Sequence, residues 1–377
     1  MVNERDTQYL LLTPGPLSTT RTVREAMMQE HSTWDIDYNS IVQSIRERLV
    51  RLATDDAARH TAALMPGSGT FAVESVIGSV IPPDGKLLVL NNGAYGARIT
   101  RISQMLGIDT IELGQAEIES TDLGQVEQKL AGDSAITHVA MVHCETTTGM
   151  LNPVEVVGEI VRRLGRVFIL DAMSSFGGIP MSMESTGAHY LISSANKCVQ
   201  GVPGFGFVVA DRATLEATKG WARSHSLDLF DQWREMETKG GKWRFTSPTH
   251  VVSAFARALD ELEAEGGVNA RHSRYVANQK TMVEGMRGIG FRTLIEDEVQ
   301  SPIITSFYYP DAAEFEFQKF YDALKERGFV IYPGKVSHAQ CFRIGSIGDV
   351  HPEDMTELVG HVAKVLEEMG VNLVVSS

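Results

Sequence analysis

Short apolar segments alternate with longer amphipathic segments between about residues 62 and 211. This alternation is typical of strands and crossover helices in a mostly parallel sheet. One amphipathic segment, residues 153–164, carries an apolar stripe at helical spacing. The pattern therefore predicts an α/β fold. Its strands are expected at residues 86–90, 110–113, 137–143, 167–171, 189–193 and 205–210.

The pattern changes after Ser247, where two long helical stretches follow each other. They are expected at residues 251–265 and 270–287, and each stops at glycine, a common helix terminator. The rest of the chain predicts a small α+β domain. Its elements are expected at residues 303–308, 329–332 and 341–344 (strands) and 314–327 and 352–369 (helices). We expect a large domain of residues 17–260 and a small domain formed by residues 1–16 and 261–377.

The composition indicates a globular protein with an acidic surface. The 377 residues are 43% hydrophobic, and the net charge of -14 would repel nucleic acid over most of the surface. Apolar runs such as Leu87–Leu90 are far shorter than the roughly 20 residues that cross a bilayer. The N-terminus lacks a signal-peptide pattern, which predicts a cytoplasmic protein that does not bind membranes. Cys144, Cys198 and Cys341 show no C-x-x-C spacing, so we expect neither disulfides nor a metal site.

Two ionisable residues follow neighbouring strands of the predicted sheet. Asp171 ends the strand VFILD, and Lys197 follows the next strand after Ala195-Asn196. Open α/β sheets bind ligands at the carboxyl ends of their strands, so both side chains should face one crevice. Taken alone, Asp171 could equally be a helix N-cap or a magnesium ligand, and most lysines after strands are solvated.

Together the two residues suit pyridoxal phosphate (PLP). A carboxylate at the position of Asp171 keeps the pyridine nitrogen protonated, and the Lys197 amine supplies a covalent imine linkage. Once a substrate displaces it, the same amine can move a proton at the substrate carbon.

A glycine-rich segment, PGSGT, precedes an apolar helical run. Ser68, Gly69 and Thr70 would place backbone N–H groups at a helix N-terminus, where they can hold a phosphate. The segment also fits the dinucleotide pattern G-x-G-x-x-G/A. Pro66 interrupts the preceding strand, however, and the next strand ends in Asn91-Asn92 instead of a ribose-binding acid. We therefore reject a dinucleotide site, and an ordinary glycine-rich turn is the remaining alternative.

Two loops at the same edge of the sheet offer further contacts. Tyr95, in NNGAYG, could stack on a pyridine ring, although ordinary packing explains it equally well. Thr146, in HCETTTG, could bond the phenolate oxygen of that ring.

A series of motifs in this chain resembles the class V aminotransferases. The resemblance extends from about Tyr9 to the final helix. It implies PLP fold type I, with a large mostly parallel-sheet domain and a small α+β C-terminal domain. In chain order the motifs are LLTPGP, PGSGT, NNGAYG, HCETTTGM, LDAMSSFGG, SSANKCVQGVPGFGF, KWRFTSPTH and YPGK…CFRIG.

The resemblance implies roles for individual residues. Lys197 and Asp171 would be the catalytic pair, and Arg343 would bind the anionic end of the substrate, because its planar fork suits carboxylates and phosphonates. Thr246 would reach the cofactor phosphate of a neighbouring subunit, which implies an obligate homodimer. The implied cofactor contacts within one chain are Ser68, Gly69, Thr70, Tyr95, Thr146, Asp171, Asn196 and Lys197.

The motifs SSANKC and KWRFTSPTH resemble most the family members that transfer the amino group of 2-aminoethylphosphonate to pyruvate, in phosphonate degradation. The products would be phosphonoacetaldehyde and L-alanine. The second charge of the phosphonate lacks an assigned partner, for which Arg98 and Arg244 are candidates. A serine/alanine–glyoxylate aminotransferase would have the same cofactor residues and remains the nearest alternative.

A PLP lyase or cysteine desulfurase is a more remote alternative, since it needs a reactive thiolate near the cofactor. Cys198 adjoins Lys197 but should point to the opposite side, while Cys341 would share a strand face with Arg343. A non-enzymatic regulatory protein of this fold would be supported by loss of Lys197 or by a fused DNA-binding module, and the sequence has neither feature.

Overall fold

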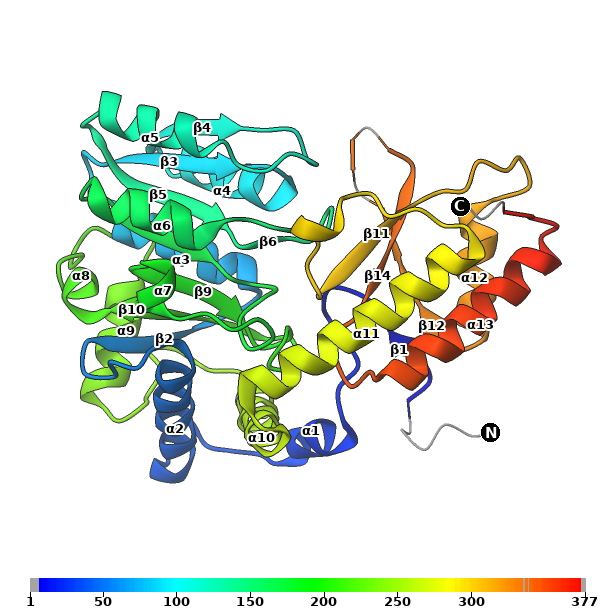
Figure 1. Cartoon of the computed structure of the whole chain (residues 1–377). Coiled ribbons are helices and arrows are strands. Elements are labelled where there is room, and N and C mark those ends of the chain that lie inside the picture. Colours follow the sequence, from blue (N-terminus) through cyan, green and yellow to red (C-terminus); the bar gives the residue numbers. More distant parts are fainter. Residues whose placement is uncertain (1–6, 335, 338, 374–377) are drawn as a thin grey trace.

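The structure is a computed structural model that describes residues 7–334, 336–337 and 339–373 (Figure 1). A large sheet with helices on both faces forms one part of the molecule, and the C-terminal strands and helices lie beside it. Helix α11 (Gly267–Ile289) runs from the first part along the second. This arrangement confirms the predicted α/β class.

The large sheet has seven strands. Six run in the same direction, whereas β10 is antiparallel to both of its neighbours, β2 and β9. In sheet order the strands are β2 (His60–Pro66), β10 (Phe205–Asp211), β9 (Tyr190–Ser194), β8 (Val167–Asp171), β5 (Ile136–Val142), β3 (Lys86–Asn91) and β4 (Asp109–Gly114). Strand β2 lies outside the predicted set, and the others match it within one residue at each end.

Helices cover both faces of this sheet because its strands are apolar on both sides. In β3, Leu88 and Leu90 pack into one core with α2, α6 and α10, whereas Leu87 and Val89 pack into the other with α3, α4 and α9. The helices are α1 (Arg21–Glu25), α2 (Ile36–Ala53), α3 (Gly69–Val80), α4 (Ala94–Met105), α5 (Leu123–Gly132), α6 (Val154–Arg163), α7 (Met183–Thr186), α8 (Arg212–Glu216), α9 (Leu229–Thr238) and α10 (Thr249–Glu265).

The C-terminal part has its own core of apolar side chains. An antiparallel sheet in the order β11 (Ile304–Tyr308), β14 (Cys341–Gly345) and β13 (Tyr332–Pro333) packs with α11, α12 (Phe317–Glu326) and α13 (Pro352–Glu368). Strand β1 (Leu10–Leu11) pairs in parallel with β12 (Phe329–Val330), which brings the N-terminal segment to this part. That pairing agrees with a small domain built from both ends of the chain, whose boundaries at residues 16/17 and 260/261 stay a prediction.

The structure corrects one predicted strand of the C-terminal part. Residues 329–332 do not form a single strand: β12 pairs with β1, whereas β13 pairs with β14. The chain changes partners at Ile331, which is buried. Pro333 then lies on the edge strand of its sheet, where its missing N–H group costs no ladder hydrogen bond.

Candidate active site

A cavity of about 320 Å³ opens at the carboxyl ends of β8 and β9 and at the N-terminus of α3. This is the edge of the sheet at which the sequence predicts the ligand crevice. The predicted site residues that line the cavity are Ser68, Gly69, Thr70, Tyr95, Asp171, Asn196 and Lys197. Thr146, Thr246 and Arg343 do not line it.

The Lys197 amine is held by the N-terminal segment. Its Nζ donates hydrogen bonds to the carbonyl oxygens of Pro14 (2.7 Å) and Gly15 (3.4 Å). Gly15 has φ of 111°, and a Cβ there would lie 2.7 Å from the Cδ of Lys197, so glycine is required. Burial lowers the pKa of Lys197 to about 8, although Asp171 raises it. A larger share of the amine is therefore neutral, which is the form that acts as a nucleophile or base.

Asp171 ends β8 with its carboxylate buried against the cavity. Its Oδ1 accepts a hydrogen bond of 2.9 Å from the backbone N–H of Met173. Burial raises the pKa of Asp171 to about 6, while the Met173 contact and the charges of Arg98 and Lys197 act to lower it. At neutral pH the group is mostly charged, so it can stabilise a cation in the cavity.

The N-terminus of α3 lies at another side of the cavity. Ser68 is its N-cap residue and makes no side-chain capping bond, and the helix begins at Gly69. A Cβ on Gly69 would lie 2.3 Å from the sulfur of Met173, so a larger residue would require the Met173 side chain to move. The exposed N–H groups and the helix dipole favour an anion here.

Arg98 adds a positive charge beside this helix terminus. Its Nη1 donates to Thr70 Oγ1 at 3.2 Å, and its guanidinium lies 4.9 Å from the centre of the Tyr95 ring. Among the residues that the structure describes, no carboxylate forms an ion pair with Arg98. The cavity thus combines a buried amine, a carboxylate and an anion-binding end.

Arg343 lies outside the cavity lining, on β14, and is only 2% exposed. Its Nε and Nη2 donate to the Pro333 carbonyl at 3.0 and 2.9 Å, and its Nη1 donates to the Thr146 carbonyl at 2.7 Å. The guanidinium lies 4.9 Å from the centre of the Tyr332 ring. Burial lowers the pKa of Arg343, but a guanidinium stays charged at physiological pH. Thr146 therefore contributes through its backbone, while the predicted contact of its side chain stays a prediction.

Thr246 and Arg244 also lie away from the cavity within one chain. Thr246 is exposed, as a residue that contacts a neighbouring subunit would be in a single chain. Arg244 donates to the His225 carbonyl at 3.0 Å and forms an ion pair of 3.4 Å with Asp231. This pairing makes Arg244 a weak candidate for the second phosphonate charge.

Glu145 and Met173 are among the residues near the site that were not predicted. Glu145 is fully buried; its carboxylate accepts hydrogen bonds from the backbone of Tyr95 (3.2 Å) and from the backbone and hydroxyl of Thr147 (3.1 and 2.7 Å). Met173 lines the cavity two positions after Asp171. The sequence feature that could have predicted Glu145 is an acidic residue between polar neighbours in HCETTTG. No sequence feature indicated Met173.

Cys144, Cys198 and Cys341 are not among the residues that line the cavity. Burial raises the pKa of Cys144 to about 11 and that of Cys198 to about 12, so neither forms a thiolate at neutral pH. The Sγ of Cys198 points to the Ser174 carbonyl, 3.1 Å away. The geometry therefore disfavours desulfurase chemistry.

Comparisons with known proteins agree with this site. The family model described as "Aminotransferase class-V" matches residues 26–343. The chain belongs to the class V aminotransferases. It is 60% identical to 2-aminoethylphosphonate–pyruvate transaminase of Syntrophobacter fumaroxidans over 96% of this chain and 97% of the relative. It is 59% identical to the transaminase of the same name from Vibrio vulnificus over 95% of this chain and 98% of the relative.

A solved structure shows the same fold. Pyridoxamine-pyruvate aminotransferase from Mesorhizobium loti superposes with a TM-score of 0.89 at 22% identity, over 99% of this chain and 95% of that one. The chain is thus a PLP-dependent aminotransferase of fold type I. The cavity suits this cofactor, because an amine and a carboxylate face it together with an anion-binding helix terminus.

Proposed function

We propose that this class V aminotransferase transfers the amino group of 2-aminoethylphosphonate to pyruvate and releases phosphonoacetaldehyde and L-alanine. The choice of substrates is supported by relatives named for this reaction at 60% and 59% identity over nearly the whole chain. The chemistry is supported by one structural observation, the convergence of Lys197 and Asp171 on the cavity beside the α3 N-terminus.

Separate groups of the cavity would hold separate parts of the cofactor. Ser68, Gly69 and Thr70 suit the phosphate, Asp171 the ring nitrogen, and Tyr95 a face of the ring. When bound, PLP supplies an electron sink that stabilises negative charge developing on the substrate carbon. Arg98 bonds Thr70 of the phosphate site, which favours a contact with the cofactor phosphate over one with the substrate phosphonate.

Lys197 is the proposed acid–base group. Its Nζ would take a proton from the carbon that bears the amino group of 2-aminoethylphosphonate. In the second half-reaction it would return a proton to C2 of the product alanine. A pKa of about 8 suits both directions, because both forms of the amine are populated near neutral pH.

Arg343 would bind the anionic end of each substrate in turn. A guanidinium has five N–H donors. Three of them are used by the Pro333 and Thr146 carbonyls, so two remain, one on each Nη, among the contacts that the structure describes. That pair suits bidentate contact with a carboxylate or with two phosphonate oxygens. The carbonyls hold the fork in place before substrate arrives.

A homodimer and a cytoplasmic location belong to the same proposal. Thr246 and the adjacent Phe245, which is 45% exposed, would contact the neighbouring subunit, and Phe71 at the start of α3 is 50% exposed. Apolar side chains exposed beside a predicted shared site favour an interface. In the described part of the chain, no helix combines the length and apolarity needed to span a bilayer.

The experiment that tests the function uses single half-reactions. Purified enzyme loaded with PLP is mixed separately with 2-aminoethylphosphonate, serine or alanine, and the visible absorbance of the bound cofactor is followed. We expect 2-aminoethylphosphonate to convert it and pyruvate to restore it. Conversion by serine with no response to 2-aminoethylphosphonate would leave the fold and cofactor intact and replace the substrate assignment with the serine/alanine–glyoxylate alternative.

A further inference from the structure

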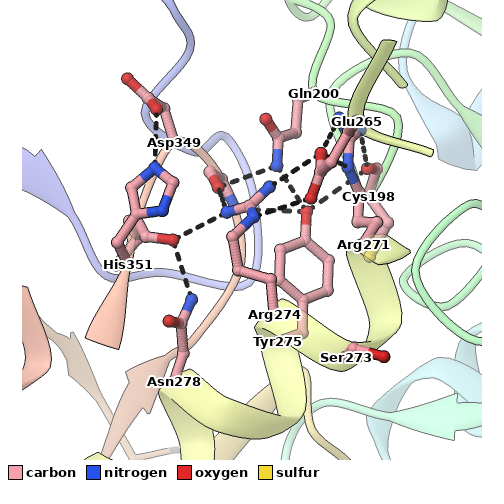
Figure 2. A network of polar contacts seen from close by, with 12 residues as sticks. Cys198, Gln200, Glu265, Arg271, Ser273, Arg274, Tyr275, Asn278, Asp349 and His351 are labelled. Carbon is pink, nitrogen blue, oxygen red and sulfur yellow. Dashed lines mark hydrogen bonds and ion pairs between the residues drawn. The ribbon is translucent and has the colours of Figure 1, made fainter. Parts of the chain in front are cut away.

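A partly buried polar network joins the turn that carries Lys197 to helix α11 and to the loop after β14 (Figure 2). The turn lies in the large-sheet part of the molecule, whereas the loop follows the strand that carries Arg343. Besides backbone carbonyls, the network contains the side chains of Gln200, Glu265, Arg271, Arg274, Tyr275 and Asn278.

Gln200 is the first part of this network. Among the residues that the structure describes, it is the only non-glycine residue with positive φ, 69°. Its backbone N–H donates to the Lys197 carbonyl at 2.7 Å, and its Nε2 donates to the Tyr275 hydroxyl (2.7 Å) and to the Gly348 carbonyl (2.8 Å). A glycine would adopt this backbone with less strain, but it could not bridge the three segments.

Arg271 holds the same turn from α11. Its Nη1 donates to the carbonyls of Cys198 and Val199, at 2.9 and 3.1 Å, the two residues directly after Lys197. Glu265 fixes the guanidinium through a bond of 2.9 Å to Nε. Arg271 is 1% exposed, so its bonds to the Cys198 and Val199 carbonyls are shielded from competing water.

Arg274 extends the network to the loop after β14. Its Nη1 donates to the carbonyls of Gly348 and Val350, at 2.8 and 2.7 Å, and its Nε donates to the second oxygen of Glu265 at 2.8 Å. Glu265 therefore links Arg271, which binds the turn after Lys197, with Arg274, which binds the loop after β14. The turn after Lys197 and the loop after β14 are therefore held in a fixed position relative to each other.

We propose that Gln200, Tyr275 and Arg271 are positioning residues for Lys197. They fix its turn against α11 and the loop after β14, so that the amine stays in place when the substrate displaces it from the cofactor. This inference rests on the proposed role of Lys197. Arg343 is held independently by the Pro333 and Thr146 carbonyls, so the network acts on proton transfer and leaves substrate affinity unchanged.

The test uses two mild variants, because Arg271 is too deeply buried for a clean substitution. Tyr275→Phe removes only the hydroxyl, and Gln200→Gly keeps a residue that accepts the backbone conformation. The control is Ser273→Ala, on the same helix. Among the contacts that the structure describes, its hydroxyl bonds only the Asn269 carbonyl of its own helix. For both variants we expect kcat to fall about tenfold or more, since misplacing a reacting group by about 1 Å costs up to about 100-fold. KM for 2-aminoethylphosphonate should stay within about threefold.

A second readout needs no substrate. PLP is achiral, so its visible circular dichroism arises from being held rigidly in an asymmetric site. We expect the two variants to show weaker visible dichroism at unchanged absorbance, and Ser273→Ala to match the wild type. Lower thermal stability with unchanged kcat and dichroism would show that the network only supports packing, and would overturn the proposal. A rise in KM without a fall in kcat would also overturn it. If the wild type fails to convert 2-aminoethylphosphonate, the proposed function fails, but the dichroism still tests the network.

Discussion

At the scale of single residues, burial sets the chemistry of the site. The pKa of Lys197 is lowered to about 8 and that of Asp171 is raised to about 6, in both cases chiefly because burial disfavours the charged form. The carboxylate nevertheless remains mostly charged at pH 7, while about one lysine amine in ten is neutral. An anionic partner and a usable base therefore coexist in one cavity.

The pH dependence of cofactor capture follows from the Lys197 amine. Only the neutral amine attacks the aldehyde of PLP, and the lowered pKa moves the midpoint of its deprotonation from 10.5 to about 8. Below this midpoint, the capture rate of the apoprotein should rise about tenfold per pH unit, and above it the rate should level off. Stopped-flow absorbance measures it. A rate that keeps rising to pH 10 would contradict the lowered pKa, and Lys197→Ala should show no visible absorbance and no turnover.

Arg343→Ala should weaken the use of both substrates while PLP stays bound. Two charge-assisted hydrogen bonds would be lost, each contributing about 1.5–3 kcal/mol, so KM should rise by roughly 100-fold or more. Arg343→Lys keeps a positive charge but cannot form the bidentate contact, and should recover only part of the loss. Loss of the cofactor from Arg343→Ala, seen by absorbance after dialysis, would contradict the assigned role.

At the scale of secondary-structure elements, short segments that are distant in sequence build the site. The two-stranded hairpin of β6 (Cys144–Glu145) and β7 (Met150–Leu151) contacts the start of α4 through Glu145, and it holds Arg343 of β14 through the Thr146 carbonyl. Burial raises the pKa of Glu145, which its hydrogen bonds with Thr147 and Tyr95 act to lower. The hairpin is the element that links the cavity with Arg343, the proposed substrate-binding arginine.

Glu145→Gln should disturb this link. The carboxylate accepts hydrogen bonds at both oxygens, from Tyr95 and Thr147. In the glutamine variant an NH₂ group replaces one of these oxygens. That NH₂ group would then face an N–H donor and could not accept its hydrogen bond. A buried unmatched donor costs about 1–3 kcal/mol, so we expect a lower melting temperature and higher KM values. Calorimetry and steady-state kinetics measure the two effects. The control is Glu119→Gln at an exposed position, and equal stability of both variants would contradict the role of the hairpin.

At the scale of the whole molecule, the site depends on both ends of the chain and, in our proposal, on a second subunit. Pro14 and Gly15 reach the Lys197 amine because β1 pairs with β12 in the C-terminal part. Exposed Thr246 lies outside the cavity of its own chain. In this proposal a single chain would provide the covalent chemistry, whereas the phosphate would be bound by two.

We therefore expect a particle of twice 41.4 kDa by light scattering. Thr246→Ala should remain dimeric and lower the affinity for PLP by about tenfold or more, because one charge-assisted hydrogen bond contributes about 1.5–3 kcal/mol. Equilibrium dialysis measures this affinity. Thr356→Ala, at an exposed position on α13, is the control and should bind PLP normally. A fully active monomer would contradict the shared site.

The sequence by itself determined the fold class, because apolar periodicity and strand ends are local properties of the chain. It also placed Asp171, Lys197 and the segment from Ser68 to Thr70 at one edge of the sheet, since parallel strands share that edge. The structure brings these residues to one cavity as expected. Their catalytic roles stay predictions until the variants above are measured.

Only the tertiary structure decided which backbone groups hold the side chains of Lys197 and Arg343 in place. The carbonyl of Pro14 contacts Lys197, and the carbonyls of Thr146 and Pro333 contact Arg343, although the partners lie far apart or in separate strands. Backbone carbonyls carry no residue-specific signal, so no motif could reveal these contacts. The exchange of strand partners at Ile331 could not be predicted either. Pairing between distant strands depends on packing, which local periodicity does not record.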